Sequence, residues 1–145
     1  PTSETTEEDR IKRISAVNAI EERPEFSKYL ELVETHEASE SFQGDEKKTY
    51  LVPTNTAFEE LSEQRLAQLE TSADSFADLR ETMSLKEPLK LEELRKLERT
   101  TNSEGKTVSV ERANNYIWVE GAPITVPDIE FNNGMIHGVD IIYNR

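Results

Sequence analysis

The chain has 145 residues, the length of a single domain, and carries 30 acidic against 17 basic side chains, for a net charge of −13 at pH 7. A surface of that sign repels nucleic acid and anionic lipid, so neither is expected as a partner. The absence of cysteine excludes disulfides, thiolate nucleophiles and cysteine-ligated metal sites. No apolar run approaches the ~20 residues needed to span a bilayer.

The N-terminal end predicts a tether followed by one domain. Residues 1–8 contain no apolar side chain and are expected to be a flexible polar tether, left by removal of a targeting segment or by trimming. Residues 9–145 are expected to form a single domain. Asp9 can cap a first helix, whose apolar positions recur every three residues at Ile11, Ile14, Val17 and Ile20.

A second helix is expected to begin at Pro24, because proline is tolerated in a first turn. Its apolar face contains Phe26, Tyr29, Leu30, Leu32 and Val33. His36 falls near its end, where it is expected to be solvated. The charged residues 41–48, with Gly44 and Asp45, predict a loop.

A strand, a turn and a helix are predicted in quick succession around residues 49–61. Residues 50–52 form an apolar run that Pro53 ends, and Thr56 with Glu59 fits a capping box for the next helix. Two more short helices follow, with Ser72 or Asp74 as the cap of the second. Their apolar positions are Leu66 and Leu69, then Phe76, Leu79 and Met83.

After Pro88 the pattern changes to that of strands. Alternating or apolar runs predict strands at residues 106–111, 116–119, 124–126 and 135–143, with turns at 114–115 and 120–121. Helices first and strands last indicate an α+β domain, with N-terminal helices packed on a mixed or antiparallel sheet formed largely by the C-terminal half.

The sequence offers little catalytic or metal chemistry. The two histidines, His36 and His137, lie about a hundred residues apart, and no zinc, phosphate-loop, dinucleotide, calcium-loop or nucleophile-elbow spacing is present. We therefore expect no enzyme, no catalytic residue, no cofactor and no metal. His137 lies in an apolar strand, which predicts a core histidine whose ring nitrogens bond to backbone; a ligand or catalytic role is the alternative.

Two segments together resemble the fasciclin domain family. Residues 49–61 resemble its first signature box, a Thr-led strand followed by Pro-Thr-Asn and Ala-Phe, and residues 133–142 resemble its second, Asn-Gly followed by His and Asp. The matching positions, expected to act mainly in the fold, are Thr49, Pro53, Thr54, Asn55, Ala57, Phe58, Asn133, Gly134, His137 and Asp140. The resemblance implies helices packed on a β-sandwich or wedge.

The resemblance also implies a role in cell adhesion or matrix association. Fasciclin domains are mostly secreted or surface-anchored, so an extracellular, cell-surface or periplasmic location and a protein or glycan partner are implied. Asp128 and Ile129 match the family's adhesive Asp-Ile before the second box, whereas its Tyr-His element is absent, since residues 37–136 contain no histidine. Alternatively, Ile129 is a core anchor and Asp128 a turn residue.

Two other functions stay open. Some fasciclin-like proteins carry carotenoids, and a carrier of an apolar small molecule needs an apolar cleft. Side chains that could supply one at the end of the sheet are Tyr116, Ile117, Trp118, Phe131 and Met135. A sensory or regulatory ectodomain is the other alternative. The isolated domain is expected to be monomeric.

Overall fold

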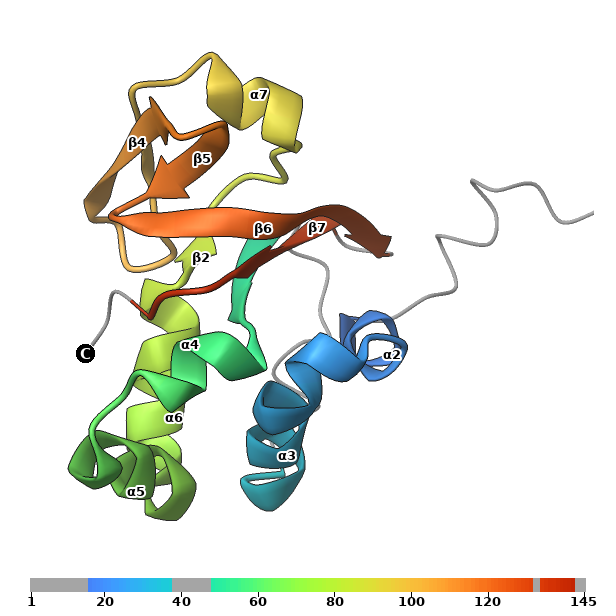
Figure 1. The fold of residues 1–145 in the computed structure, drawn as a ribbon, viewed down its shortest axis with the longest axis vertical. Helices are drawn as coiled ribbons and strands as arrows, with labels where there is room; N and C mark the ends of the chain where they lie inside the picture. Colours follow the sequence, from blue (N-terminus) through green and yellow to red (C-terminus); the bar gives the residue numbers. More distant parts are fainter. Residues whose placement is uncertain (1–15, 38–47, 132–133, 143–145) are drawn as a thin grey trace, which may run out of the picture.

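The computed structural model describes residues 16–37, 48–131 and 134–142 (Figure 1). Its helices are α2 (Ala16–Glu21), the 3-10 helix η1 (Pro24–Phe26), α3 (Ser27–Thr35), α4 (Asn55–Glu59), α5 (Glu63–Thr71), α6 (Ala73–Thr82) and α7 (Leu91–Arg95). Its strands are β1 (Lys48–Pro53), β2 (Ser84–Leu85), β3 (Arg99–Thr101), β4 (Thr107–Ala113), β5 (Tyr116–Val119), β6 (Ala122–Phe131) and β7 (Gly134–Val139). The predicted tether at 1–8, the Asp9 cap, Asn133 and the loop predicted at 41–48, apart from Lys48 in β1, lie outside the described residues.

The strands form one mixed sheet in the order β2-β1-β7-β6-β5-β4-β3. β1 and β7 are parallel neighbours, and the other pairs are antiparallel. In the C-terminal half, β4, β5 and β6 follow one another by short turns, and β7 pairs antiparallel with β6. This arrangement confirms the α+β class and the mixed sheet that the sequence predicts.

The two end strands of this sheet meet and nearly close it into a barrel. Leu85 at the end of β2 forms an antiparallel bridge with Asn102, just after β3. The amide of Lys86 donates to the Thr101 carbonyl at 3.1 Å, and the amide of Ser103 donates to the Ser84 carbonyl at 2.9 Å. We call this junction between residues 84–86 and 101–103 the seam. Unpaired edge strands can pair with other chains, so the seam protects both ends of the sheet.

The helices α2 to α6 gather at one end of the sheet, and α7 lies at the other, beside β4 and β5 (Figure 1). Phe26 of η1 and Phe76 of α6 are fully buried, and the rings of Tyr29 and Phe76 lie 5.4 Å apart. Each such side chain contributes about 1.5–3 kcal/mol through its burial. The apolar faces predicted for these helices therefore form the core.

Helix starts agree with the sequence only in part. Ser72 caps α6 by accepting a hydrogen bond from the amide of Ser75 at 3.2 Å, as one of the two predictions had it. The capping box at Thr56 is wrong, because the N-cap is two residues earlier, at Thr54, and α4 begins at Asn55. Thr54 is the N-cap, and its own amide is bound to the Val139 carbonyl at 2.9 Å, which fixes where the strand ends.

Strand ends also differ from the prediction. β6 extends over ten residues rather than three, with register shifts on either side of Val126, and β7 ends at Val139 rather than near Tyr143. The sequence patterns missed β2, α7 and β3, each of five residues or fewer. The predicted turns are present: Asn114 and Asn115, then Glu120 and Gly121, all have positive φ.

Candidate functional site

The two signature segments lie side by side, although about eighty residues separate them in the sequence. β1 carries the first and β7 the second, and the parallel register places Leu51 opposite His137 and Pro53 opposite Val139. Both segments are buried along most of their length. Their polar side chains therefore bond to protein atoms rather than to solvent.

His137 is fully buried and uses both ring nitrogens. Its Nδ1 accepts a hydrogen bond from the amide of Asp128 at 3.0 Å, and its Nε2 lies 2.7 Å from the Leu89 carbonyl. A backbone amide can only donate and a carbonyl can only accept, so the proton of the neutral ring is on Nε2. Burial lowers the pKa of His137 below its ordinary 6.5, against the opposing effects of the Leu89 carbonyl and the Asp128 carboxylate. The predicted bonds to backbone are present, and neither nitrogen is open to a ligand.

Thr49, on the neighbouring strand β1, also binds the segment 87–89, which contains the Leu89 carbonyl that His137 contacts. Its hydroxyl donates to the Glu87 carbonyl at 2.7 Å and accepts from the Leu89 amide at 2.7 Å. Leu89 is thus bound through its amide by Thr49 and through its carbonyl by His137. The two signature segments together fix the chain that leads into α7.

Asp140 joins three elements just beyond β7. Its Oδ1 accepts a hydrogen bond from the Thr54 hydroxyl at 2.7 Å and another from the Thr125 hydroxyl at 2.9 Å. Thr54 precedes α4, and Thr125 lies in β6. This carboxylate therefore connects the first signature segment to the bulged part of β6.

Asn55 ties the start of α4 to the start of α3. Its Oδ1 accepts from the Lys28 amide at 2.9 Å, and its Nδ2 donates to the Ser27 hydroxyl at 2.9 Å and to the Pro24 carbonyl at 3.2 Å. Ala57 and Phe58, on the buried side of α4, lie in the core. Asn55 therefore joins two helices, and Ala57 and Phe58 pack in the core, so all three have structural roles.

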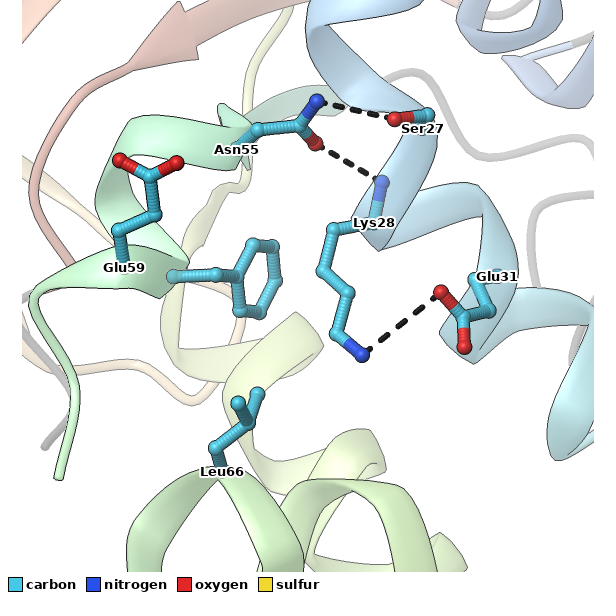
Figure 2. A pocket seen from close by; sticks show the side chains of 7 residues that line it. Ser27, Lys28, Glu31, Asn55, Glu59 and Leu66 are labelled. Carbon is cyan, nitrogen blue, oxygen red and sulfur yellow. Dashed lines mark hydrogen bonds and ion pairs between the residues drawn. The ribbon is translucent and has the colours of Figure 1, made fainter. Parts of the chain in front are cut away.

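A groove of about 380 Å³ opens beside Asn55, between α3, α4 and α5 (Figure 2). Phe58 and Leu66 contribute its apolar surface, and the Lys28 side chain runs along it. The Lys28 ammonium is compensated by two carboxylates, at 3.7 Å from Glu31 and 3.5 Å from Glu70. The groove therefore combines apolar lining side chains with a lysine whose charge is already paired.

Asp128 and Ile129 differ sharply in exposure. Ile129 is only 7% exposed and packs in the core, whereas Asp128 is exposed at the bulge of β6, with φ of 57°. The Asp128 Oδ1 accepts from the Leu91 amide at 2.8 Å, at the first residue of α7. Only Asp128 of this pair presents its side chain to solvent.

The five side chains proposed for an apolar cleft do not form one. Ile117, Phe131 and Met135 are buried, and the ring of Phe131 contacts that of Tyr50. Trp118 is half-buried, with its indole donating to the Ala113 carbonyl at 2.8 Å, and Tyr116 is 47% exposed. The division follows from the strand period, since adjacent side chains of β5 point to opposite faces.

His36 is not the solvated residue that the sequence suggested. It is half-buried, its ring stacks on Phe76 at 5.6 Å between centroids, and its Nε2 lies 2.6 Å from the Leu69 carbonyl. Leu69 and Phe76 are more than thirty residues away in the sequence. No local pattern around His36 could have indicated these partners.

Sequence reasoning also missed a polar hollow of about 400 Å³ at the tip of the β4–β5 hairpin. Arg95, at the end of α7, and Arg112 line it together with the turn residues Asn114 and Asn115 and the exposed Tyr116. Nη1 of Arg112 donates to the carbonyls of Arg95 and Leu97. Seventeen residues separate the two arginines, so only the packing of α7 on the hairpin brings them together.

Two further findings concern the part of the chain that the structure describes. No group of three or more His, Asp or Glu side chains there is placed to hold a metal ion. None of its helices has the length and hydropathy of a membrane span.

Comparison with known proteins decides the family. The family model of the fasciclin domain matches residues 24–142, which is most of the chain. The chain belongs to the fasciclin domain family. Domains of this family generally serve as adhesion modules outside the cell, and they are known as non-enzymatic.

A solved structure agrees with this fasciclin fold. It is a FAS1 domain pair from the insect cell adhesion molecule Fasciclin I, which superposes with a TM-score of 0.75 at 15% identity over 90% of this chain. The present chain spans about half the length of that structure, because 50% of that chain is covered. At 15% identity, the match shows a shared fold.

Proposed function

We propose that this fasciclin domain acts outside the cytosol, secreted, at a cell surface or in a periplasm, and mediates adhesion by binding a protein or a glycan through the surface around Asp128. The observation that carries the proposal is the exposed Asp128 carboxylate at the bulge of β6. Recovery of the native protein in the cytosol on cell fractionation would contradict the location.

The contacts of Asp128 support its use as a fixed contact point. Its amide is bound by His137 and its Oδ1 by the Leu91 amide, so its backbone and side chain are both held. A carboxylate has about four acceptor positions, and only one is used by Leu91. A pre-positioned group loses little conformational entropy when a partner binds.

The burial of Ile129 removes this side chain from the surface proposed to contact a partner. With 7% of its surface exposed, Ile129 supports the bulge from below rather than meeting a partner directly. The partner would therefore meet Asp128 together with exposed residues of α7, such as Glu92. This geometry favours a polar contact over insertion of an apolar side chain.

The test is capture of cells or matrix from the source organism on beads that carry the domain. Asp128→Asn keeps an Oδ1 acceptor for the Leu91 amide and tolerates the left-handed backbone, while it removes the charge. We expect this variant to fold normally and to lose capture by about 10-fold or more, the scale of one charged hydrogen bond. Asp74→Asn, the same substitution at an exposed site on α6, at the end of the sheet away from α7, is the matched control.

An alanine variant would confound this test. Asp128→Ala removes the acceptor at the start of α7 and places alanine at φ of 57°, so it is expected to lower the free energy of unfolding by about 1–2 kcal/mol. Thermal denaturation of all variants separates the two effects. Unchanged capture by a folded Asp128→Asn domain would reject Asp128 as the contact, and failure of the folded wild-type domain to capture would reject the adhesive function.

A further inference from the structure

We propose that the hollow at the tip of the β4–β5 hairpin binds the carboxylate of an acidic sugar, as in a uronic-acid-containing glycan. The inference deepens the proposed function, since it names a glycan chemistry, and it rests on that function for its biological setting. α7 connects the surface around Asp128 with the hollow. Its first residue, Leu91, is bound by Asp128, and its last residue, Arg95, lines the hollow.

The size and position of the hollow suit one or two sugar rings. Its volume of about 400 Å³ lies in the range of small-ligand sites. Two elements build it, the end of α7 and the β4–β5 hairpin, which pack against each other. The turn at its rim is a tight one, with Asn114 at φ of 54° and Asn115 at φ of 70°, as in a two-residue hairpin of type I′.

The Arg112 guanidinium is held in place while most of its donors remain available. Nη1 donates to the carbonyls of Arg95 and Leu97, at the end of α7. A guanidinium has five N–H donors, so those on Nε and Nη2 remain. Within the described part of the chain, the N–H groups on Nε and Nη2 of Arg112 donate to no acceptor and pair with no carboxylate.

Arg95 adds a second guanidinium to the same hollow. Within the described part of the chain its side chain has no ion-pair or hydrogen-bond partner. Two uncompensated guanidinium groups form an attractive site for a planar carboxylate, because arginine can bind one with two parallel hydrogen bonds. The Lys28 groove lacks this property, since two carboxylates already compensate its ammonium.

The distribution of charge also favours this end of the molecule. Residues 86–112 carry seven basic and six acidic side chains, whereas the whole chain has a net charge of −13. An anion is thus repelled least near α7 and the hairpin. A polyanion of high charge density would still be repelled by the rest of the surface, so a carboxylate on an otherwise neutral sugar fits best.

The other lining residues favour a sugar over a simple anion. Asn114 and Asn115 supply amide donors and acceptors that can match ring hydroxyl groups. Tyr116 is 47% exposed, a large aromatic surface on which the apolar face of a sugar ring can pack. Charge, amide groups and an exposed ring together match the three chemical parts of a uronic acid.

The experiment titrates isotope-labelled domain with trigalacturonate and follows backbone amide shifts by NMR. We expect shifts centred on residues 112–117, and affinity weakened by about 10-fold or more in Arg95→Gln, the scale of a lost charged hydrogen bond. Arg99→Gln is the matched control, because Arg99 is also an exposed arginine but lies outside the hollow, and its affinity should stay within about 2-fold of wild type. Fully methyl-esterified trigalacturonate, which lacks the charge, should bind as weakly as the acid binds Arg95→Gln.

Several results would overturn the inference. Equal binding of acid and ester would remove the role of the carboxylate, and shifts confined to another face would remove the site. Tighter binding of triglutamate would indicate a peptide ligand, and tighter binding of a heparin tetrasaccharide would indicate sulfate. The NMR titration uses purified components and the bead assay uses cells or matrix, so the two proposals can fail independently. Absence of trigalacturonate binding would reject the sugar site but not capture through Asp128. Loss of capture in Asp128→Asn would support the Asp128 contact but says nothing about the sugar site.

Discussion

Burial and the hydrogen bond from the Asp128 amide to Nδ1 favour the neutral imidazole of His137 in the folded protein. A proton added to Nδ1 would face the Asp128 amide, a donor, so protonation requires this hydrogen bond to break. The folded pKa lies below the ordinary 6.5, and burial is the main cause. The unfolded chain therefore binds more protons as the pH falls below 6.5, and the free energy of unfolding must decrease there.

We predict that this decrease depends on His137. In denaturant titrations from about pH 7.5 to about 5.5, above the range where most carboxylates titrate, the wild-type domain should lose stability as the pH falls. His137→Gln should be less stable at pH 7.5 but show little slope. His36→Gln removes the other histidine, so the slope that it retains belongs to His137. A slope in His137→Gln as steep as in wild type would contradict the assignment.

Gly134 is fixed by a backbone contact between the two signature segments. A Cβ at this residue would lie 2.0 Å from the carbonyl oxygen of Lys48, and its φ is 147°. We predict that Gly134→Ala lowers the free energy of unfolding by about 3 kcal/mol, since β1 and β7 must separate to accommodate the methyl group. Gly105→Ala is the control for φ alone.

The comparison of the two glycines separates strain from collision. Gly105 also has positive φ, 86°, but a Cβ there meets nothing within 4 Å. Its replacement should therefore lower the free energy of unfolding by only about 1–2 kcal/mol, which denaturant titration can distinguish from the larger effect. Equal losses for the two variants would show that the approach of Lys48 does not determine Gly134.

At the level of elements, the signature segments were visible in the sequence but their partners were not. The motifs indicate that Thr49 and His137 matter, whereas the segment that they bind, residues 87–89, has no motif of its own. The bonds from Thr49 and His137 to Leu89 span forty and forty-eight residues. Such contacts arise from the arrangement of β1 and β7, which a local pattern does not contain.

The short elements were missed for a related reason. Periodicity needs a window of about eleven residues or more, and α7 has five. What starts α7 is a set of specific contacts: the Glu93 side chain accepts from the Lys90 amide at 3.1 Å, and Asp128 accepts from the Leu91 amide. The polar hollow was missed with it, because Arg95 and Arg112 are neighbours only once α7 is in place.

At the scale of the whole molecule, the seam between β2 and β3 restricts how a partner can bind. Hydrogen bonds across the seam use the amides of Lys86 and Ser103, so these positions are unavailable for addition of a partner strand. The order of helices and strands along the sequence predicted the α+β class. It gave no sign that the sheet nearly closes, since β2 and β3 are too short to be recognised from a pattern. Partner contacts are then left to side chains at loops and turns, as proposed for Asp128 and the hairpin.

Asn102 lies at this seam: its Nδ2 donates to the Thr82 carbonyl, just before β2, at 3.4 Å, and its Oδ1 orders the turn after β3. It is 2% exposed, and its Oδ1 accepts from the amides of Glu104 at 3.0 Å and Lys106 at 2.9 Å. We predict that Asn102→Ala lowers the free energy of unfolding by about 2–3 kcal/mol, because both amides lose their acceptor. Opening of the seam should also speed hydrogen exchange at the Lys86 and Ser103 amides more than at the amides of β6 and β7.

Exchange rates at single amides distinguish a local opening from a general loss of stability. In Thr107→Ala, a change at an exposed position of β4 that leaves the backbone pairing with Thr101 intact, the two seam amides should exchange as in wild type. In Asn102→Ala, the freed edges of β2 and β3 should also promote self-association, which size-exclusion chromatography over a concentration series would detect by comparison with the wild-type domain. Protection of Lys86 and Ser103 that is unchanged in Asn102→Ala would mean that the strands close without Asn102, and that β-sheet pairing alone is sufficient for the barrel.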